Sequence, residues 1–310
     1  MKQVLTLLLL ILSCFAGFGS DKHTYVYNIA GSDTLRLDFY QARTETPAPV
    51  VVFAFGGGFK GGERDNKEYI PMFEYLSDNG VSVASIDYRT LLKSVPPQTL
   101  MSPEGFKASL IAAIDTAVTD LLRATSYIDA NSAKLNIDPK QIFTLGSSAG
   151  AITVLQAEYD ICNSAVSLPS FGLPAEFNYA GVISMAGAVY AEGFPHLDTV
   201  PCPILLFHGD ADSVVPFDKA VLGDFGLWGS NTLAGILSEK TIPHRFHRVN
   251  GASHEIATRP MNENRGEILD FIRAVCNFEA GNIVNTVEST PGLTDYRTDF
   301  TILDYIKSNL

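Results

Sequence analysis

The hydrophobic positions along this chain change repeatedly between the period of strands and the period of helices. Near the start, residues 24–29 and 34–40 alternate apolar and polar side chains on either side of Gly31, which predicts an antiparallel hairpin. Residues 50–55 are a continuous apolar run, as expected of a strand that is covered on both faces, and 81–86 are predicted to be the next buried strand. Further buried strands are predicted at 141–145, 179–184, 203–208 and 245–249.

Segments with helical spacing separate these strands. Residues 66–79 carry apolar side chains on one helix face, and Gly80 is a typical residue just past a helix end. Strands that alternate with helices predict an α/β fold with a mostly parallel sheet. Further helices are predicted along the face of Phe106, Leu110, Ile114, Val118 and Leu121, and over 149–162, 232–238 and 268–275, while 90–103 is expected to be irregular and 136–139 to be a turn.

No internal repeat, low-complexity block or change of composition divides residues 20–310, which predicts a single domain. From about residue 279 to 310 the chain continues beyond the last predicted helix, and 300–306 is mildly amphipathic. We expect this C-terminal extension to pack against the body of the domain. Dimerisation through it is the alternative.

The first residues resemble an export signal. Residues 4–12 are apolar but too short to span a bilayer comfortably, and small residues follow them. A signal peptide over 1–19, cleaved after Ala16 or Gly19, is one interpretation. The residues before Cys14 resemble a lipoprotein box, so a lipoprotein signal that ends before Cys14 is the other. Both routes predict an exported protein that is periplasmic, secreted or lipid-anchored to the outer surface of a bacterial membrane, with membrane contact only through Cys14.

Composition narrows the possible partners. Of 310 residues, 46% are hydrophobic and 18% charged, and the formal net charge is −12 with no run of lysine or arginine. We therefore do not expect nucleic acid as a partner. The net negative charge of the protein would also repel strongly anionic substrates. Beyond the leader, Cys162, Cys202 and Cys276 allow at most one disulfide, and their apolar neighbours favour three buried thiols. No metal-ligand spacing such as C-x-x-C or H-E-x-x-H is present, so no metal or cofactor is predicted.

The first candidate for chemistry follows the apolar run 142–145. The spacing of Gly146, Ser148 and Gly150 matches a nucleophile elbow, in which a strand turns sharply into a helix with serine at the apex. Flanking glycines are needed because larger side chains would collide there. The turn exposes the serine oxygen above the sheet edge and points the next backbone N–H, that of Ala149, at the same place. Alone the pattern is weak, because small-residue runs are common in turns.

A serine nucleophile needs a base, and the histidines offer few candidates. Among six histidines, His254 lies in a small-residue loop after the last predicted strand, from which its side chain can reach the carboxyl edge of the sheet. His244 and His247 flank or occupy that strand, where a structural role is expected. His208 ends an earlier strand and is expected to support the loop that follows it. His254 is therefore the predicted base.

The acid and the oxyanion donors complete the constellation. Asp210 and Asp212 both follow the strand that ends at His208, and Asp212 is preferred because the acid must reach past the strand end. Asp210 would then shape the turn. Residues 56–62 form a glycine-rich loop in which Gly57 and Gly58, together with Ala149, can present converging N–H groups to an oxyanion. This loop has neither the Walker spacing nor the dinucleotide pattern.

At this point the chain resembles an α/β-hydrolase of the esterase/lipase group, near the bacterial carboxylesterases and the hormone-sensitive-lipase-like enzymes. The resemblance covers about residues 50–276. It implies a mostly parallel sheet with an antiparallel N-terminal hairpin, helices on both faces and a minimal cap, and it carries the family's triad order onto Ser148, Asp212 and His254. The motifs that carry it are Phe55-Gly56-Gly57-Gly58-Phe59, Asp87-Tyr88-Arg89, Gly146-Ser147-Ser148-Ala149-Gly150, His208-Gly209-Asp210-Ala211-Asp212-Ser213-Val214-Val215-Pro216 and Gly251-Ala252-Ser253-His254.

The chain departs from the family in two places. Phe55 takes the position where the glycine loop commonly begins with histidine, which puts the bracing contact of that loop in doubt. The long N-terminal cap of the lipase-like members is absent and the excursion at 189–201 is short, which suggests an open site with 90–103 at its rim.

Together these features predict a serine carboxylic ester hydrolase that forms an acyl-enzyme and needs no cofactor. By analogy, an exported enzyme with an open site would remove acetyl or feruloyl groups from polysaccharides. One alternative is a serine peptidase of the same fold, although those enzymes usually carry a large extra domain. Another is a non-catalytic binding protein on a hydrolase scaffold, which the intact triad argues against. The oligomeric state is left open.

Overall fold

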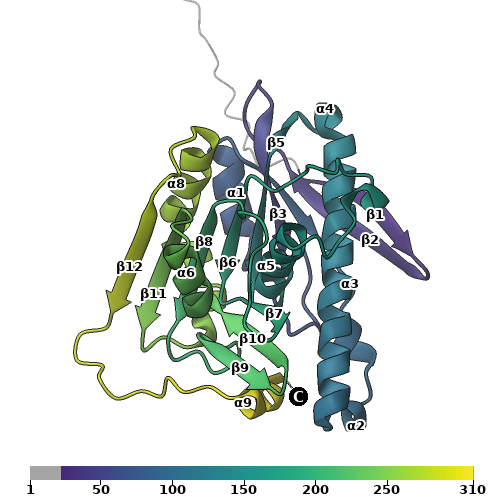
Figure 1. The fold of residues 1–310 in the computed structure, drawn as a ribbon. Coiled ribbons are helices and arrows are strands. Elements are labelled where there is room, and N and C mark those ends of the chain that lie inside the picture. The colour runs from purple at the N-terminus through teal and green to yellow at the C-terminus, as the bar shows by residue number, and fades with distance from the viewer. Residues whose placement is uncertain (1–21, 310) are drawn as a thin grey trace, which may run out of the picture.

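A nine-stranded sheet runs through the computed structural model, which describes residues 22–309 (Figure 1). Its strand order is β1-β2-β4-β3-β5-β6-β8-β11-β12. The expected leader, with Cys14 and both processing routes, lies outside the described residues. The strands are β1 (Lys22–Ala30), β2 (Asp33–Tyr40), β3 (Ala48–Ala54), β4 (Ser82–Ile86), β5 (Ile137–Ser147), β6 (Gly181–Met185), β8 (Ile204–Gly209), β11 (His244–Asn250) and β12 (Ile283–Ser289).

The sheet is mostly parallel, as the alternation of strands and helices predicted. From β4 through β3 and β5 to β12 every neighbouring pair is parallel, whereas β1 pairs antiparallel with β2, and β2 with β4. The continuous apolar run in β3 and the residues of β4, including Ser82 and Ser85, are almost all buried, because helices cover both faces of the central strands. The chain therefore has an α/β fold with an antiparallel N-terminal hairpin.

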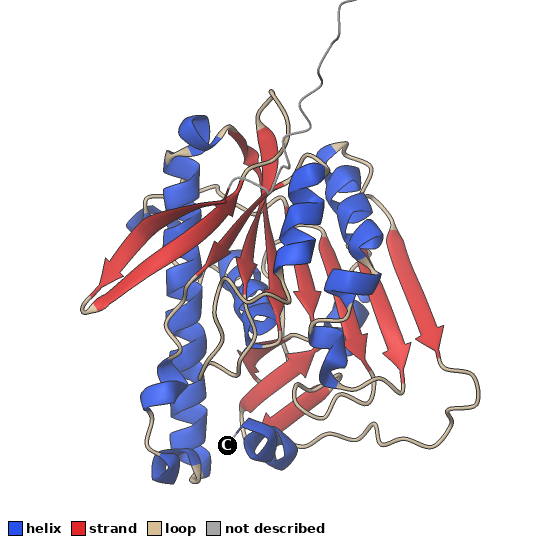
Figure 2. Cartoon of the chain, turned by 180° about the vertical axis from the view of Figure 1, so that it is seen from behind, coloured by secondary structure: helices blue, strands red, loops and turns tan. Residues whose placement is uncertain are grey.

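Helices lie on both faces of this sheet. In Figure 1, α3, α5 and α6 lie in front of the strands, and the view from behind in Figure 2 brings α1 and α8 to the front. The helices are α1 (Ile70–Asp78), α2 (Pro97–Leu100), α3 (Pro103–Ala130), α4 (Ser132–Leu135), α5 (Ala149–Cys162), α6 (Ser230–Glu239), α7 (Pro260–Glu263), α8 (Arg265–Cys276) and α9 (Ile302–Asn309), with short 3₁₀ turns η1 (Leu91–Ser94), η2 (Leu168–Phe171) and η3 (His254–Ala257).

Several local predictions need correction. The helix expected from residue 66 begins at Ile70, after a turn in which the Asn66 side chain accepts from the Glu68 N–H. The turn expected at 136–139 is instead the irregular start of β5, where pairing with β3 changes register. A local bond of turn type persists inside that strand, since the Lys140 N–H donates to Asp138. The segment 90–103 contains η1 and α2.

A second sheet of three short antiparallel strands was not predicted. It consists of β7 (Ala188–Glu192), β10 (Phe225–Gly229) and β9 (Lys219–Leu222), and β10 leads directly into α6. In Figure 1 these strands lie near the carboxyl ends of the parallel strands. The sequence excursion at 189–201 is therefore partly ordered as β7.

The C-terminal extension packs on the body, as expected, but through an element that was not predicted. Strand β12 pairs in parallel with β11 at the edge of the main sheet, although all its residues are exposed. Cys162 and Cys202 are buried, whereas Cys276 at the end of α8 is partly exposed, so the prediction of three buried thiols is wrong for Cys276. All three are free thiols.

Candidate active site

Ser148 lies at the sharp turn between β5 and α5. Its backbone has φ 51° and ψ −116°, a conformation that non-glycine residues rarely adopt and that often marks active sites. The flanking glycines are required by close backbone approach. A Cβ at Gly150 would collide with the carbonyl oxygen of Ala54 in β3, and a Cβ at Gly146 would collide with the carbonyl oxygen of Gly150. The elbow predicted from the sequence is therefore present.

The structure brings Ser148, His254 and Asp212 into one hydrogen-bonded chain. The Oγ of Ser148 lies 2.8 Å from Nε2 of His254. On the other side of the ring, Nδ1 lies 2.8 Å from Oδ2 of Asp212 and 3.1 Å from its Oδ1. His254 follows β11 and Asp212 follows β8, so neighbouring parallel strands present both side chains at the same sheet edge.

Asp212 is held as a carboxylate despite its burial. Burial raises its pKa, but hydrogen bonds from His208 and His254 outweigh that effect and hold the pKa well below its ordinary value. The N–H groups of Val214 and Val215 also donate to its Oδ1, at 2.8 and 2.9 Å. A charged carboxylate on Nδ1 favours the tautomer in which Nε2 of His254 can accept a proton.

His208 lies behind the acid loop, as the sequence suggested. Its ring is fully buried, and Nε2 lies 3.3 Å from the Asp212 carboxylate while Nδ1 lies 2.8 Å from the Ser230 hydroxyl. The side chain thus connects the loop after β8 to the first residue of α6.

Asp210 has a different set of partners. Its Oδ1 accepts from the Gly251 N–H at 2.6 Å, and its Oδ2 lies 2.7 Å from Arg248 and 3.3 Å from the Tyr296 hydroxyl. It therefore joins the acid loop to the histidine loop and to the C-terminal extension. This agrees with a role in shaping the turn.

The glycine loop lies beside the nucleophile. Gly57 and Gly58 line the same hollow as Ser148, and Ala149 begins α5, where helix N–H groups lack intrahelical acceptors. With Phe55 in place of histidine, the glycine loop is still held by contacts with a neighbouring side chain. Its ring stacks on Tyr88 at 4.3 Å between centroids, and the Tyr88 hydroxyl donates to the Phe55 carbonyl at 2.7 Å.

Tyr69 is a site residue that the sequence reasoning assigned only to a helix face. Its hydroxyl hydrogen-bonds with the Gly56 backbone and the Ser147 side chain, and burial raises its pKa. The residue lies just before α1 and lines the hollow above Ser148. A tyrosine shortly after a glycine-rich loop was the available signal. Its bonds connect the glycine loop to the elbow.

The hollow at the nucleophile measures about 610 Å³ and is open to solvent. Beyond the elbow and the glycine loop, it is lined by Val214 of the acid loop, Ala257 and Thr258 near η3, and Ser308 of α9. The prediction that 90–103 forms the rim is not supported. Thr90, Leu91, Lys93 and Ser94 instead line a separate polar hollow, which also includes Phe55 and Gly62.

Residues 22–309 contain neither a candidate metal cluster nor a candidate membrane span. That part of the chain contains no group of three or more histidine, cysteine or acidic side chains placed to hold a metal ion. Nor is any of its helices both long and apolar enough to cross a membrane.

This chain is similar, over parts of its length, to a family model and to known proteins. The family model BD-FAE matches residues 37–160. The chain is 24% identical, over 77% of its length, to a probable isoprenylcysteine alpha-carbonyl methylesterase of Oryza sativa, and 25% identical, over 60%, to the methylesterase of Arabidopsis thaliana. It spans 60% and 48% of the lengths of these relatives.

A thermophilic esterase from Thermogutta terrifontis has a similar structure, with a TM-score of 0.58 at 17% identity, over 83% of this chain and 93% of that one. At this identity the likeness establishes the fold. Taken with the family model and the relatives, it shows that this chain shares the α/β-hydrolase fold of known esterases.

Proposed function

We propose that this protein is a serine carboxylic ester hydrolase that works through an acyl-enzyme. The observation that carries the proposal is the unbroken chain of hydrogen bonds from Ser148 Oγ through the His254 ring to Asp212. A serine hydroxyl is a weak nucleophile until a neighbouring base accepts its proton, and this arrangement supplies that base with an orienting carboxylate.

In the proposed reaction, Ser148 Oγ attacks the ester carbonyl carbon while His254 Nε2 takes the hydroxyl proton. The carbonyl oxygen becomes an oxyanion, which the N–H groups of Gly57, Gly58 and Ala149 would stabilise. When the carbonyl re-forms, the bond to the alcohol oxygen breaks and His254 gives its proton to that oxygen. Water, activated by the same ring, then attacks the acyl-enzyme, releasing the acid and restoring the Ser148 hydroxyl.

The test replaces the nucleophile. Ser148→Ala should fold normally and lose kcat toward nitrophenyl acetate by on the order of 10⁴-fold or more, because triad members act as a unit. Ser170→Ala is the matched control, since that hydroxyl lies on the surface in η2 and bonds only to the Ser167 carbonyl. Parent-like hydrolysis by Ser148→Ala would exclude the proposed nucleophile.

A fluorophosphonate probe separates this proposal from a binding protein on a hydrolase scaffold. A solved structure of the similar Thermogutta esterase is described as phosphorylated by paraoxon, so an organophosphorus probe suits this fold. We expect the parent to be labelled at Ser148. An unlabelled parent would favour the binding protein.

For the substrate we propose acyl esters on carbohydrate polymers, with acetyl or feruloyl as the acyl group. The open hollow supports this, because a polymer can lie across an open site without threading into it. Acetylated xylan, feruloylated oligosaccharides and peptide nitroanilides, assayed side by side on the parent, test it. Preference for the nitroanilides would favour a peptidase.

We also propose that the protein is exported, by signal peptidase cleavage near residue 19 or by lipidation of Cys14. Expression of the full chain in a bacterial host, with mass analysis of the mature N-terminus, distinguishes the routes. If Cys14 is lipidated, Cys14→Ser should move the protein from the membrane fraction to the soluble fraction. If the signal is cleaved in the ordinary way, the same substitution should leave the distribution of the protein unchanged. If the protein is recovered from the cytoplasm with residues 1–19 still attached, export is refuted.

A further inference from the structure

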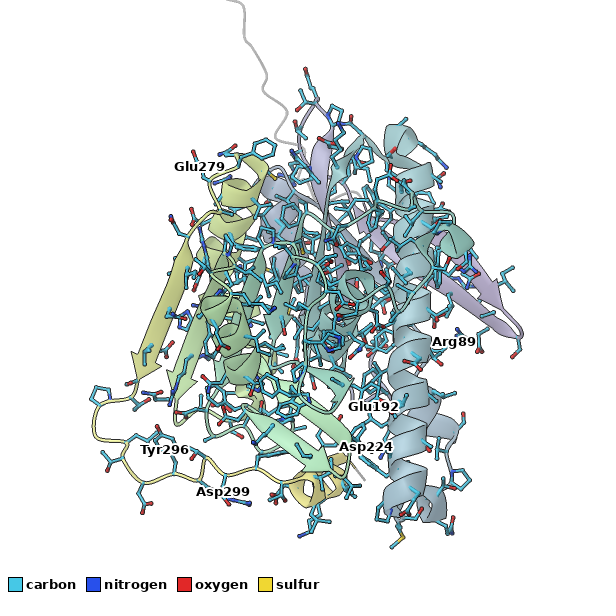
Figure 3. The ribbon with its side chains drawn as sticks, viewed as in Figure 1. Arg89, Glu192, Asp224, Glu279, Tyr296 and Asp299 are labelled. Carbon is cyan, nitrogen blue, oxygen red and sulfur yellow. The ribbon has the colours of Figure 1, made fainter. Side chains whose placement is uncertain are left out.

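The C-terminal extension crosses the sheet edge that carries the triad. After β12 the chain runs along the carboxyl ends of the strands to α9, and Figure 3 shows Tyr296 and Asp299 on this connection. The Tyr296 hydroxyl reaches Asp210, and the Leu293 side chain packs so tightly on Gly251 that a Cβ there would collide with it. The connection thus lies on both the acid loop and the histidine loop.

Helix α9 is fixed by two buried side chains. Ile302 is 8% exposed and Tyr305 is 2% exposed, whereas Leu303 between them is 61% exposed. The Tyr305 ring meets Phe106 of α3 edge to face, with centroids 5.8 Å apart. A helix this short is not stable alone in water, so packing of this face must hold it in place. Its charged contacts, Arg297 with Asp304 and Asp299, are largely exposed and contribute little.

The far end of α9 reaches the active site. Ser308 lines the hollow that contains Ser148 and His254. A neighbouring polar hollow of about 340 Å³ separates the acid loop, with Asp212, from Asp304 and Lys307 of the same helix. Space beside the nucleophile is therefore bounded on the acid-loop side by a helix that belongs to the extension.

We infer that α9 is a specificity-determining wall of the site that favours esters of small acyl groups, and therefore acetyl over feruloyl among the acyl groups proposed above. The inference rests on the proposed ester hydrolysis and adds the substrate class. A long acyl chain that extends from Ser148 toward Ser308 would meet this helix, whereas an acetyl group is too short to reach it. Since Tyr305 is more deeply buried than Ile302, loosening that anchor should widen the site without altering the triad.

The experiment compares kcat/KM for nitrophenyl acetate and nitrophenyl octanoate in the full chain. Tyr305→Ala should raise the octanoate-to-acetate ratio at least about tenfold, the scale at which pocket size discriminates apolar groups. Leu303→Ala, on the exposed face of the same helix, should leave the ratio unchanged. Ser308→Trp works in the opposite direction and should lower the ratio by a similar factor, because the indole fills the hollow from the wall.

Ser308→Trp also covers the case in which Tyr305→Ala fails to fold. Ratios that stay within about twofold of the parent in every folded variant would overturn the wall while leaving ester hydrolysis intact. A parent that neither hydrolyses acetate nor reacts with the fluorophosphonate would overturn the proposed function, and the wall with it.

Discussion

At the scale of single residues, two aspartates separated by one alanine have different roles. Asp212 touches the His254 ring, whereas Asp210 contacts Arg248 and the Gly251 N–H. Both are buried and both follow β8. The difference arises from their positions in the loop after β8. Asp212 lies two residues farther along than Asp210, and its carboxylate therefore reaches past the strand end to the His254 ring.

This difference predicts opposite outcomes for two matched substitutions. Asp212→Asn should lower kcat by on the order of 10³- to 10⁴-fold, because an amide no longer favours the tautomer that accepts the serine proton. Asp210→Asn keeps an acceptor for the Gly251 N–H and should cost less than about tenfold in kcat. It should instead lower the free energy of unfolding by about 1–3 kcal/mol, since Arg248 loses its charged partner.

Nitrophenyl acetate kinetics and urea unfolding of both variants provide the test. Equal losses of kcat would mean that the acid assignment is wrong.

The sequence could predict these residues because the elbow, the acid loop and the histidine loop each have a local signature at a strand end. Tyr69 has no signature of this kind at a strand end. Its bonds to Gly56 and Ser147 arise only in the folded chain, where the residue before α1 lies beside the elbow, so apolar spacing alone assigned it to a helix face. The stacking of Phe55 on Tyr88 was hidden for the same reason, because the two rings come from neighbouring strands.

At the scale of elements, the central strands were predicted because they are buried, whereas the hairpin of β1 and β2 was predicted from its alternating pattern. The apolar run of β3 follows directly from its burial. Strand β12 has no such run because both its faces are exposed, and β9 and β10 are short, with two glycines in β10. These strands are defined by backbone hydrogen bonds to a neighbouring strand. The pattern of side chains along the sequence does not predict such pairing.

Charged side chains help to hold β12 in place. Nδ1 of His247, in β11, lies 2.9 Å from Glu267 of α8, and its Nε2 lies 3.4 Å from Glu288 of β12. The hydrogen bond to Glu267 raises the pKa of His247, burial opposes this, and Glu288 adds to the rise. In its protonated form, this ring joins α8 and β12 to β11 through two ion pairs.

This arrangement predicts a pH-dependent contribution to stability. Because the folded-state pKa of His247 is raised, its contribution is fully present below the unfolded-state pKa and is lost as pH rises through the folded-state value. His247→Gln should lower the free energy of unfolding by about 1 kcal/mol near pH 6, a figure reduced for the exposure of Glu288, and by less near pH 9.

Urea unfolding at both pH values measures the effect. His196→Gln is the control, since His196 and Asp198 form only an exposed pair. A cost for His247→Gln that grows with pH would contradict the assignment.

At the scale of the whole molecule, the three free thiols among residues 22–309 report on cooperative unfolding. Burial, with the Glu158 carboxylate beside it, raises the pKa of Cys162 to about 12, and the same causes raise that of Cys202 well above its ordinary value. Glu158 accepts from the Cys202 N–H at 2.7 Å. Cys276 is partly exposed, and burial raises its pKa to about 11. Thiolate, the reactive form, is therefore scarce at all three sites.

We therefore predict that an aromatic disulfide reagent at about pH 8 modifies Cys276 slowly in the native protein, and Cys162 and Cys202 only when the fold opens. Peptide mapping by mass spectrometry assigns each site. In rising urea, labelling of the two buried thiols should follow the loss of circular dichroism, because both lie in the core around Glu158. Cys276→Ser should abolish native-state labelling of these three sites while leaving the urea dependence unchanged. Labelling of Cys162 in native buffer as fast as Cys276, or a disulfide between Cys162 and Cys202, would show that this part of the core is open or oxidised in solution.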